Sequence, residues 1–166
     1  MSAVAAVLLA LVLLSFYLSW RATRLDRLHH RVETARAALD AALLRRAAAV
    51  LDLAADPGLD PLTAKSLSVA ANHARRAGDE ERELAESELS RELRAALHPA
   101  PKGPSRDRLA EVAVAARGVH LARVFHNDAV SDTRRARRSR LVRLLRLAGT
   151  AALPDYFEMD DRPPQR

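Results

Sequence analysis

The first twenty residues of the chain, MSAVAAVLLALVLLSFYLSW, carry no charged side chain, and arginine follows at once. An apolar stretch of this length matches the ~20 helical residues that cross a bilayer core of ~30 Å. Tyr17 and Trp20 stand at its end, where aromatic side chains favour the interface between lipid and water. The pattern predicts a transmembrane helix over residues 1–20.

A cleaved secretory signal is the alternative explanation of this stretch. Such a signal has a basic segment before a shorter apolar core and a small-residue cleavage site after it. The chain has no Lys or Arg before residue 21, and the segment SFYLSW is bulky where a cleavage site would stand. These differences favour an uncleaved anchor.

The distribution of basic residues predicts the orientation. No Lys or Arg precedes the span, whereas seven arginines lie between Arg21 and Arg46. Basic residues that flank a span stay on the cytoplasmic side. We therefore expect a single-pass protein of the inner or plasma membrane, with its N-terminus outside and its bulk in the cytoplasm.

Beyond the anchor, apolar residues recur at steps of three and four or their sums, which is the period of a helix. In the first segment they are Leu25, Leu28, Val32, Ala35, Leu39, Leu43, Val50 and Leu53. No segment alternates with period two over a useful length, and Ala, Leu, Arg and Glu dominate the composition. The sequence predicts an all-α protein whose anchor continues into a helix that ends near residue 55.

Proline and glycine divide the rest of the chain. Pro57-Gly58 marks a turn, after which Asp60 is the expected N-cap and Pro61 the first residue of a helix. A second loop, rich in proline, follows residue 98. The predicted helices span residues 21–55, 61–98 and 105–147, each ~50–65 Å long. They form an antiparallel bundle over residues 21–148, and an acidic, proline-containing tail follows at 149–166.

Gly78-Asp79 leaves the number of helices open. A kink at this point gives a three-helix bundle, and a full reversal gives a four-helix bundle. Because glycine costs a helix interior only ~1 kcal/mol, we favour a kinked or locally broken middle rod. From Leu109 to Val130 apolar residues surround the whole circumference, which indicates a helix packed on two sides.

Four short segments, in their order and spacing, carry a resemblance to a known family. They are Arg31-Val32-Glu33 with Leu43-Leu44-Arg45-Arg46, then Glu86-Ser87-Glu88-Leu89-Ser90-Arg91-Glu92-Leu93, then Val124-Phe125-His126-Asn127-Asp128-Ala129-Val130, and last Tyr156-Phe157-Glu158. Together they resemble the LemA family of small, membrane-anchored helical proteins of bacteria. The chain departs from the family at residues 47–50, which lack its apolar-Pro-Asn stretch, and at His126, where tyrosine is common. The resemblance implies fold and location rather than activity, because the family has no established biochemical activity.

The sequence offers no catalytic constellation. The absence of cysteine excludes disulfides, thiol catalysis and Cys-ligated zinc. The histidines form no Glu-x-x-His or His-Glu-x-x-His pattern, and no Gly-rich phosphate loop or Gly-x-Ser-x-Gly elbow is present. Asp26 and His29 have ligand-like spacing but no partner pair elsewhere. We expect no catalytic or metal-binding residue, no cofactor and no small-molecule substrate, and therefore no enzyme.

Charge is segregated along a chain of net charge +6. Residues 79–94 contain seven acidic and three basic side chains. Seven arginines without an acid follow further on, at Arg134, Arg135, Arg137, Arg138, Arg140, Arg143 and Arg146. One interpretation is that these two segments are solvated and face each other as a weak network. The other is that the arginines contact an anionic partner.

That partner is a protein or anionic lipid, and nucleic acid is the least favoured because no aromatic platform lies among the arginines. The number of helices bears on the choice. In a three-helix bundle the arginines lie ~50 Å from the bilayer, whereas in a four-helix bundle the last rod returns them to it. With a kinked middle rod we expect weak lipid binding and favour a protein partner.

Asn127 is the one polar residue that we assign to the core. It shares a helical face with Leu109, Val112 and Ala116. A buried asparagine in a long bundle commonly fixes the register of the helices. The alternative is a polar spot on which a partner helix docks.

These features predict a membrane-anchored, non-enzymatic scaffold or adaptor. It presents a charged, coiled-coil-like bundle to protein partners or to its own copies. Two alternatives stay open: a peripheral lipid-binding or envelope module that uses the arginine-rich helix, and a non-catalytic subunit of a membrane enzyme complex.

Overall fold

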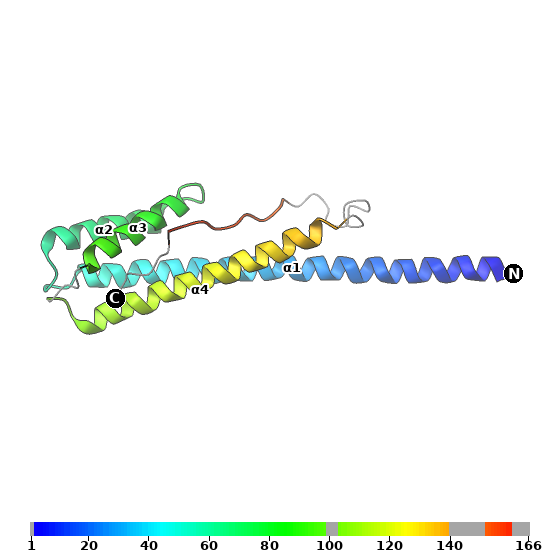
Figure 1. The fold of residues 1–166 in the computed structure, drawn as a ribbon, viewed down its shortest axis with the longest axis horizontal. Helices are drawn as coiled ribbons and strands as arrows, with labels where there is room; N and C mark the ends of the chain where they lie inside the picture. The colour runs from blue at the N-terminus through cyan, green and yellow to red at the C-terminus, as the bar shows by residue number, and fades with distance from the viewer. Residues whose placement is uncertain (1, 99–102, 140–151, 161–166) are drawn as a thin grey trace.

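The computed structural model describes residues 2–98, 103–139 and 152–160, and within these ranges the chain forms four helices and no strand. The helices are α1 (Ser2–Ala54), α2 (Pro61–Arg76), α3 (Arg82–Leu97) and α4 (Arg106–Arg137). Helices α2, α3 and α4 gather around the C-terminal part of α1, whose N-terminal part extends alone (Figure 1). The prediction of an all-α bundle is confirmed.

Helix α1 is unbroken from its apolar start to the core of the bundle. Its N-terminal part is long and apolar enough to cross a membrane, and none of that window is buried against the rest of the protein. Ser15 donates its hydroxyl to the carbonyl of Leu11 (2.9 Å), so this polar group is satisfied within the helix. The helix ends at Ala54 because Pro57 follows closely and disfavours helical backbone before it.

The middle segment is two antiparallel helices, so the expectation of one kinked rod is wrong. Ser66 at the start of α2 donates to Glu92 near the end of α3. Further along, His73 lies 3.3 Å from Glu88. The reversal at residues 77–81 lets both halves press an apolar face onto α1, whereas a straight rod would leave one half exposed to water.

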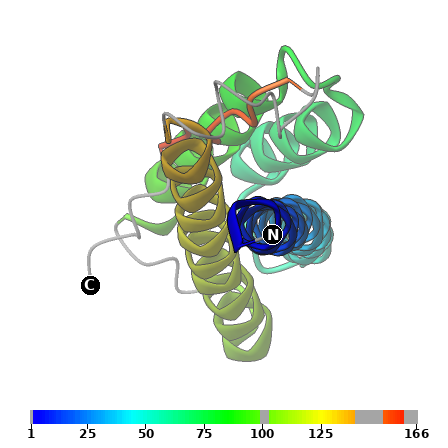
Figure 2. The ribbon, with the colours of Figure 1, turned by 90° about the vertical axis from the view of Figure 1, so that its right-hand side faces the viewer.

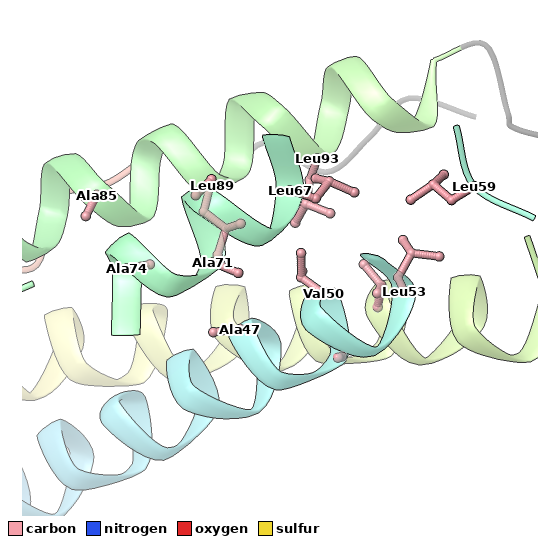
Figure 3. Packing of buried hydrophobic residues seen from close by; sticks show 13 residues of the cluster. Ala47, Val50, Leu53, Leu59, Leu67, Ala71, Ala74, Ala85, Leu89 and Leu93 are labelled. Carbon is pink, nitrogen blue, oxygen red and sulfur yellow. The ribbon is translucent and has the colours of Figure 1, made fainter. Parts of the chain in front are cut away.

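Those faces form the main core (Figure 3). Val50 and Leu53 of α1 meet Leu67 of α2 and Leu89 of α3, and all four side chains are fully buried. The alanines Ala47, Ala71, Ala74 and Ala85 fill the narrow space between the helices. Small side chains at these positions let the helix axes approach closely.

Helix α4 runs antiparallel to α1. Arg31 bonds Asp132 at one end (2.9 Å), and Arg108 donates to the carbonyl of Asp52 at the other (2.8 Å). Residues with buried side chains recur every seven positions on α4, at Val112, Val119, His126 and Thr133. Seven-residue spacing is the pattern of coiled-coil packing. Seen along α1, helix α4 lies on one side and the α2–α3 pair on another (Figure 2).

The two loops at the end of the bundle away from the N-terminus are tied together by Asp56. Its carboxylate accepts hydrogen bonds from the backbone N–H groups of Gly58 (2.9 Å) and Ser105 (3.1 Å). These bonds lower the pKa of Asp56, because they stabilise its charged form. A Cβ atom on Gly58 would lie 2.1 Å from the carbonyl oxygen of Gly103, so the loops touch through their backbones.

Candidate functional site

The described arginines at the end of α4 lie beside the start of the cationic part of α1. The Arg21 guanidinium is 3.5 Å from the hydroxyl of Ser139, which follows α4. The four-helix arrangement therefore places this end of α4 next to the end of the apolar stretch. Arg135 and Arg138 are exposed there, whereas Arg140, Arg143 and Arg146 lie outside the described residues.

Arg134 and Arg137 bind the C-terminal segment instead. Arg134 donates to the carbonyl of Pro154 (2.7 Å) and pairs with Asp155 (2.7 Å). Its guanidinium also lies over the ring of Tyr156, 4.9 Å from the centroid. Arg137 donates to the carbonyl of Ala152 (2.8 Å). In the described part of the chain, Arg134 thus pairs with an acid of the tail and not with the acidic segment 79–94.

Residues 152–160, which we call the strap, are extended and lie along α4 and α3 (Figure 1). Beyond the arginine contacts, the Glu158 N–H donates to Glu83 (2.9 Å), and the Asp160 N–H donates to the Ser87 hydroxyl (3.1 Å). The Asp160 side chain also pairs with Arg94 (2.5 Å). Helix side chains thus satisfy the strap's backbone groups, as a neighbouring strand would.

Asn127 is part of this attachment. Its side-chain amide donates to the carbonyl of Phe157 (3.1 Å), and its side-chain oxygen accepts from the Phe157 N–H (2.9 Å). The side chain is half-buried, and its neighbour His126 takes the buried position. The expectation of a core residue that fixes the register is therefore corrected: Asn127 holds the strap, because its amide both donates to and accepts from the backbone of Phe157.

A buried ion pair that the sequence analysis missed connects α1 to α3. Arg46 and Glu86 are 2% and 1% exposed. The Arg46 guanidinium donates to the carboxylate of Glu86 (2.5 Å) and to the hydroxyl of Ser90 (2.8 Å). Burial raises the pKa of Glu86, and the positive charge of Arg46 opposes that rise.

The sequence did contain a signal for this pair. Arg46 continues the seven-residue row of Leu25, Val32, Leu39 and Leu53 on α1. An arginine in such a row is carried into the core, where it requires an acidic partner.

The four segments that carry the LemA resemblance meet in two contacts. Arg46 of the first segment binds Glu86 and Ser90 of the second. Asn127 of the third segment binds Phe157 of the fourth. Residues far apart in the sequence thus form polar contacts that connect the elements of the fold.

The outer side of α4 carries apolar side chains that no other described element covers. We call this the open face of α4: Val114, Gly118, Leu121 and Phe125. Its three large side chains are 60%, 54% and 57% exposed, in chain order. At ~100° per residue the open face is turned by about 120° from the buried row. Of the two packed sides predicted for this helix, the bundle covers one.

These features define a class: a four-helix bundle built on a helix that is long and apolar enough to span a membrane. Comparisons with family models, with curated proteins and with solved structures find no match. The LemA relationship therefore remains a prediction from the motifs. Among the described residues, no group of three or more His, Asp or Glu side chains is placed to hold a metal ion.

Proposed function

We propose that the protein is a membrane-anchored, non-enzymatic scaffold that presents the open face of α4 to a protein partner. The observation that supports this proposal is that α4 carries a second row of apolar side chains, about 120° around the helix from the row that the bundle covers, and that this second row is exposed. Val114, Leu121 and Phe125 together leave a row of apolar surface that water does not favour. A partner helix that covers this row removes it from water, in the way that α1 covers the other side.

Anchoring is the second part of the proposal. Residues 1–20 span the membrane, with the N-terminus outside and the bundle in the cytoplasm. The exposed apolar side chains of this stretch and the arginines that follow it support this arrangement. Because α1 has no break, partner and membrane are held at a fixed separation.

A photoreactive benzoylphenylalanine at Leu121 tests the scaffold in native membranes. We expect an adduct with one defined polypeptide, either a second copy of the chain or another protein. The change Phe125→Asp should abolish the adduct and leave the helical content unchanged. The matched control is the same probe at Val69 of α2, which is also exposed and apolar (61%). No adduct at Leu121, or equal adducts at both positions, would contradict the proposal.

Contact with anionic lipid is a second candidate function, favoured by the approach of Arg21 to Ser139. Arg135 and Arg138 share the anchor end of the bundle with Arg21, so headgroups are within reach. Each basic residue at an anionic surface contributes about 1 kcal/mol. Since the chain has no cysteine, Ser139→Cys gives a unique site for an environment-sensitive dye.

In nanodiscs with anionic lipid, we expect this dye to report a less polar environment than in nanodiscs with neutral lipid. The changes Arg135→Gln and Arg138→Gln should remove the difference, and Arg91→Gln on α3 should not. An identical signal in both lipids would rule out the lipid-contact function and leave the scaffold proposal intact.

A further inference from the structure

One side of α1 is covered by no other described element. Seen along α1, helix α4 and the α2–α3 pair lie on two sides of it and leave a third side open (Figure 2). We call this side the outer face of α1: Thr34, Ala37, Ala41, Leu44 and Ala48. All five residues are exposed. At ~100° per residue they fall within an arc of about 80°, turned by about 160° from the buried row of Leu39, Arg46 and Leu53.

The outer face has the spacing of a coiled-coil seam. Its residues are three, four, three and four positions apart, which is the a/d repeat. The same repeat runs through the apolar stretch of α1, at Ala6, Leu9, Leu13, Phe16 and Trp20. Arg27 and His30 interrupt the repeat between these two parts. Two helices joined along this row would therefore pack most closely beyond residue 34.

The charges beside the outer face match those of a second, parallel copy. In a parallel pair of helices, the residue at a g position faces the residue five positions further on in the partner helix, at an e position. Asp40 and Arg45 have this spacing and opposite charges. Asp40 is 43% exposed and makes only a loose contact with Arg82 (3.8 Å), and Arg45 is exposed and has no ion pair among the described residues. Asp26 and Arg31 repeat the same spacing and signs two heptads earlier.

We propose that the outer face of α1 binds the same face of a second copy of the chain, as a parallel coiled coil over residues 34–48. The proposal rests on the anchoring proposed above, because two copies with the same orientation in one membrane run parallel. Arg45 of each copy pairs with Asp40 of the other, and the alanines let the two helices approach closely. Since the outer face is turned away from the core, the two bundles lie on the outer sides of the pair.

The open face of α4 suits a second copy less well. Glu111 and Asp128 continue its row at either end, and both are exposed. In a parallel pair of α4 helices each of these acids would face the same acid of the other copy, and such like-charge contacts oppose association. The two faces therefore take different partners: a second copy on α1 and another protein on α4.

Single cysteines in native membranes test the proposal, because the chain has no cysteine of its own. Ala41→Cys should form an interchain disulfide on mild oxidation, since a residue of the seam faces its own counterpart at the short distance that a disulfide requires. Two controls should form none: Arg36→Cys, exposed on α1 but outside the outer face, and Leu121→Cys, on the open face of α4. No disulfide at Ala41→Cys, or an equal yield at either control, would overturn the proposal.

The same assay tests the charge match. Added to Ala41→Cys, the change Arg45→Glu places an acid against Asp40 of the other copy and should slow disulfide formation at least about threefold. Arg45→Lys keeps the charge and should leave the rate unchanged. Equal rates in these two variants would overturn the pairing of Arg45 with Asp40 and, with it, the parallel register.

Carbonate extraction of the same membranes separates this proposal from the anchoring on which it rests. Release of the chain would contradict the anchoring, and the disulfide at Ala41→Cys decides the pairing in either case. A retained chain that forms no disulfide would overturn the pairing of copies and leave the anchored scaffold intact.

Discussion

A few polar side chains determine how the parts of this molecule are joined. Asn127 satisfies the backbone N–H and C=O of Phe157 in the strap, and Arg46 and Glu86 satisfy each other between α1 and α3. Neither role follows from an apolar pattern. The sequence indicated Arg46 only as an interruption of an apolar row, and it indicated Asn127 as polar without naming its partner. The partner is a backbone group, which leaves no trace in the sequence of the strap.

The change Asn127→Leu should loosen the strap around Phe157 while leaving the bundle folded. It removes two hydrogen bonds to Phe157, each contributing about 0.5–1.5 kcal/mol. Hydrogen exchange of the Phe157 amide should therefore accelerate at least about fivefold. Asp128→Ala changes the exposed neighbouring residue and should have no effect. If the exchange rate of the Phe157 amide is unchanged in Asn127→Leu, Asn127 does not hold the strap, and its role is to fix the register of the helices.

Removing one member of the buried ion pair should be far more damaging than removing both. Arg46→Met strands the Glu86 carboxylate in the core, which typically costs about 3–5 kcal/mol. The double change Arg46→Met with Glu86→Met should recover most of that loss, because a well-packed apolar pair can replace a buried ion pair. Urea unfolding of the full chain in detergent, followed by circular dichroism, measures the cycle. Strictly additive losses would mean that the two side chains do not depend on each other.

At the scale of the elements, periodicity predicted the helices but not every connection. The sequence predicted where α1 ends and where α2 begins, because Pro57 stops one helix and Asp60 caps the next. The reversal at Gly78 could not be predicted from the sequence, because a glycine permits a kink and a turn equally. The strap was described only as an acidic tail, because an extended segment held through its backbone has no apolar period.

The two loops at the far end of the bundle should be sensitive to a single methyl group. Gly58→Ala places a Cβ about 2.1 Å from the Gly103 carbonyl oxygen, so the backbones must separate. We expect a loss of about 1–3 kcal/mol in the free energy of unfolding. Gly118→Ala is the matched control, because a Cβ there meets nothing within 4 Å. Within a helix this second change should stabilise by roughly 1 kcal/mol, and two losses of equal size would contradict the backbone contact.

At the scale of the whole molecule, the four-helix arrangement returns the end of α4 to the end of the apolar stretch of α1, which a three-helix bundle would not do. As a consequence, the arginines at the end of α4 lie close to the apolar stretch that we propose as the membrane anchor. The strap lies between this end and the distal loops (Figure 1).

The predicted orientation can be checked with single cysteines. Ser105→Cys in the exposed distal loop should be inaccessible to a membrane-impermeant maleimide in intact cells and reactive after permeabilisation. Ser2→Cys should show the reverse dependence, since the N-terminus is predicted outside. The chain has no cysteine of its own, so each label reports one position. Labelling of Ser105→Cys in intact cells would overturn the cytoplasmic scaffold.

Because α1 is unbroken, a change in its tilt moves the far end of the bundle. Residues 21–54 extend ~50 Å from the end of the apolar stretch, with no proline or glycine among them to act as a hinge. Membrane helices tilt by ~20° on average, and a tilt of that size displaces the far end of such a rod by ~17 Å. With the membrane span that we propose, a change in bilayer thickness that alters the tilt would swing the distal loops through most of the width of a helix pair. In that arrangement, the reach of the bundle over the membrane surface depends on the lipid as much as on the protein.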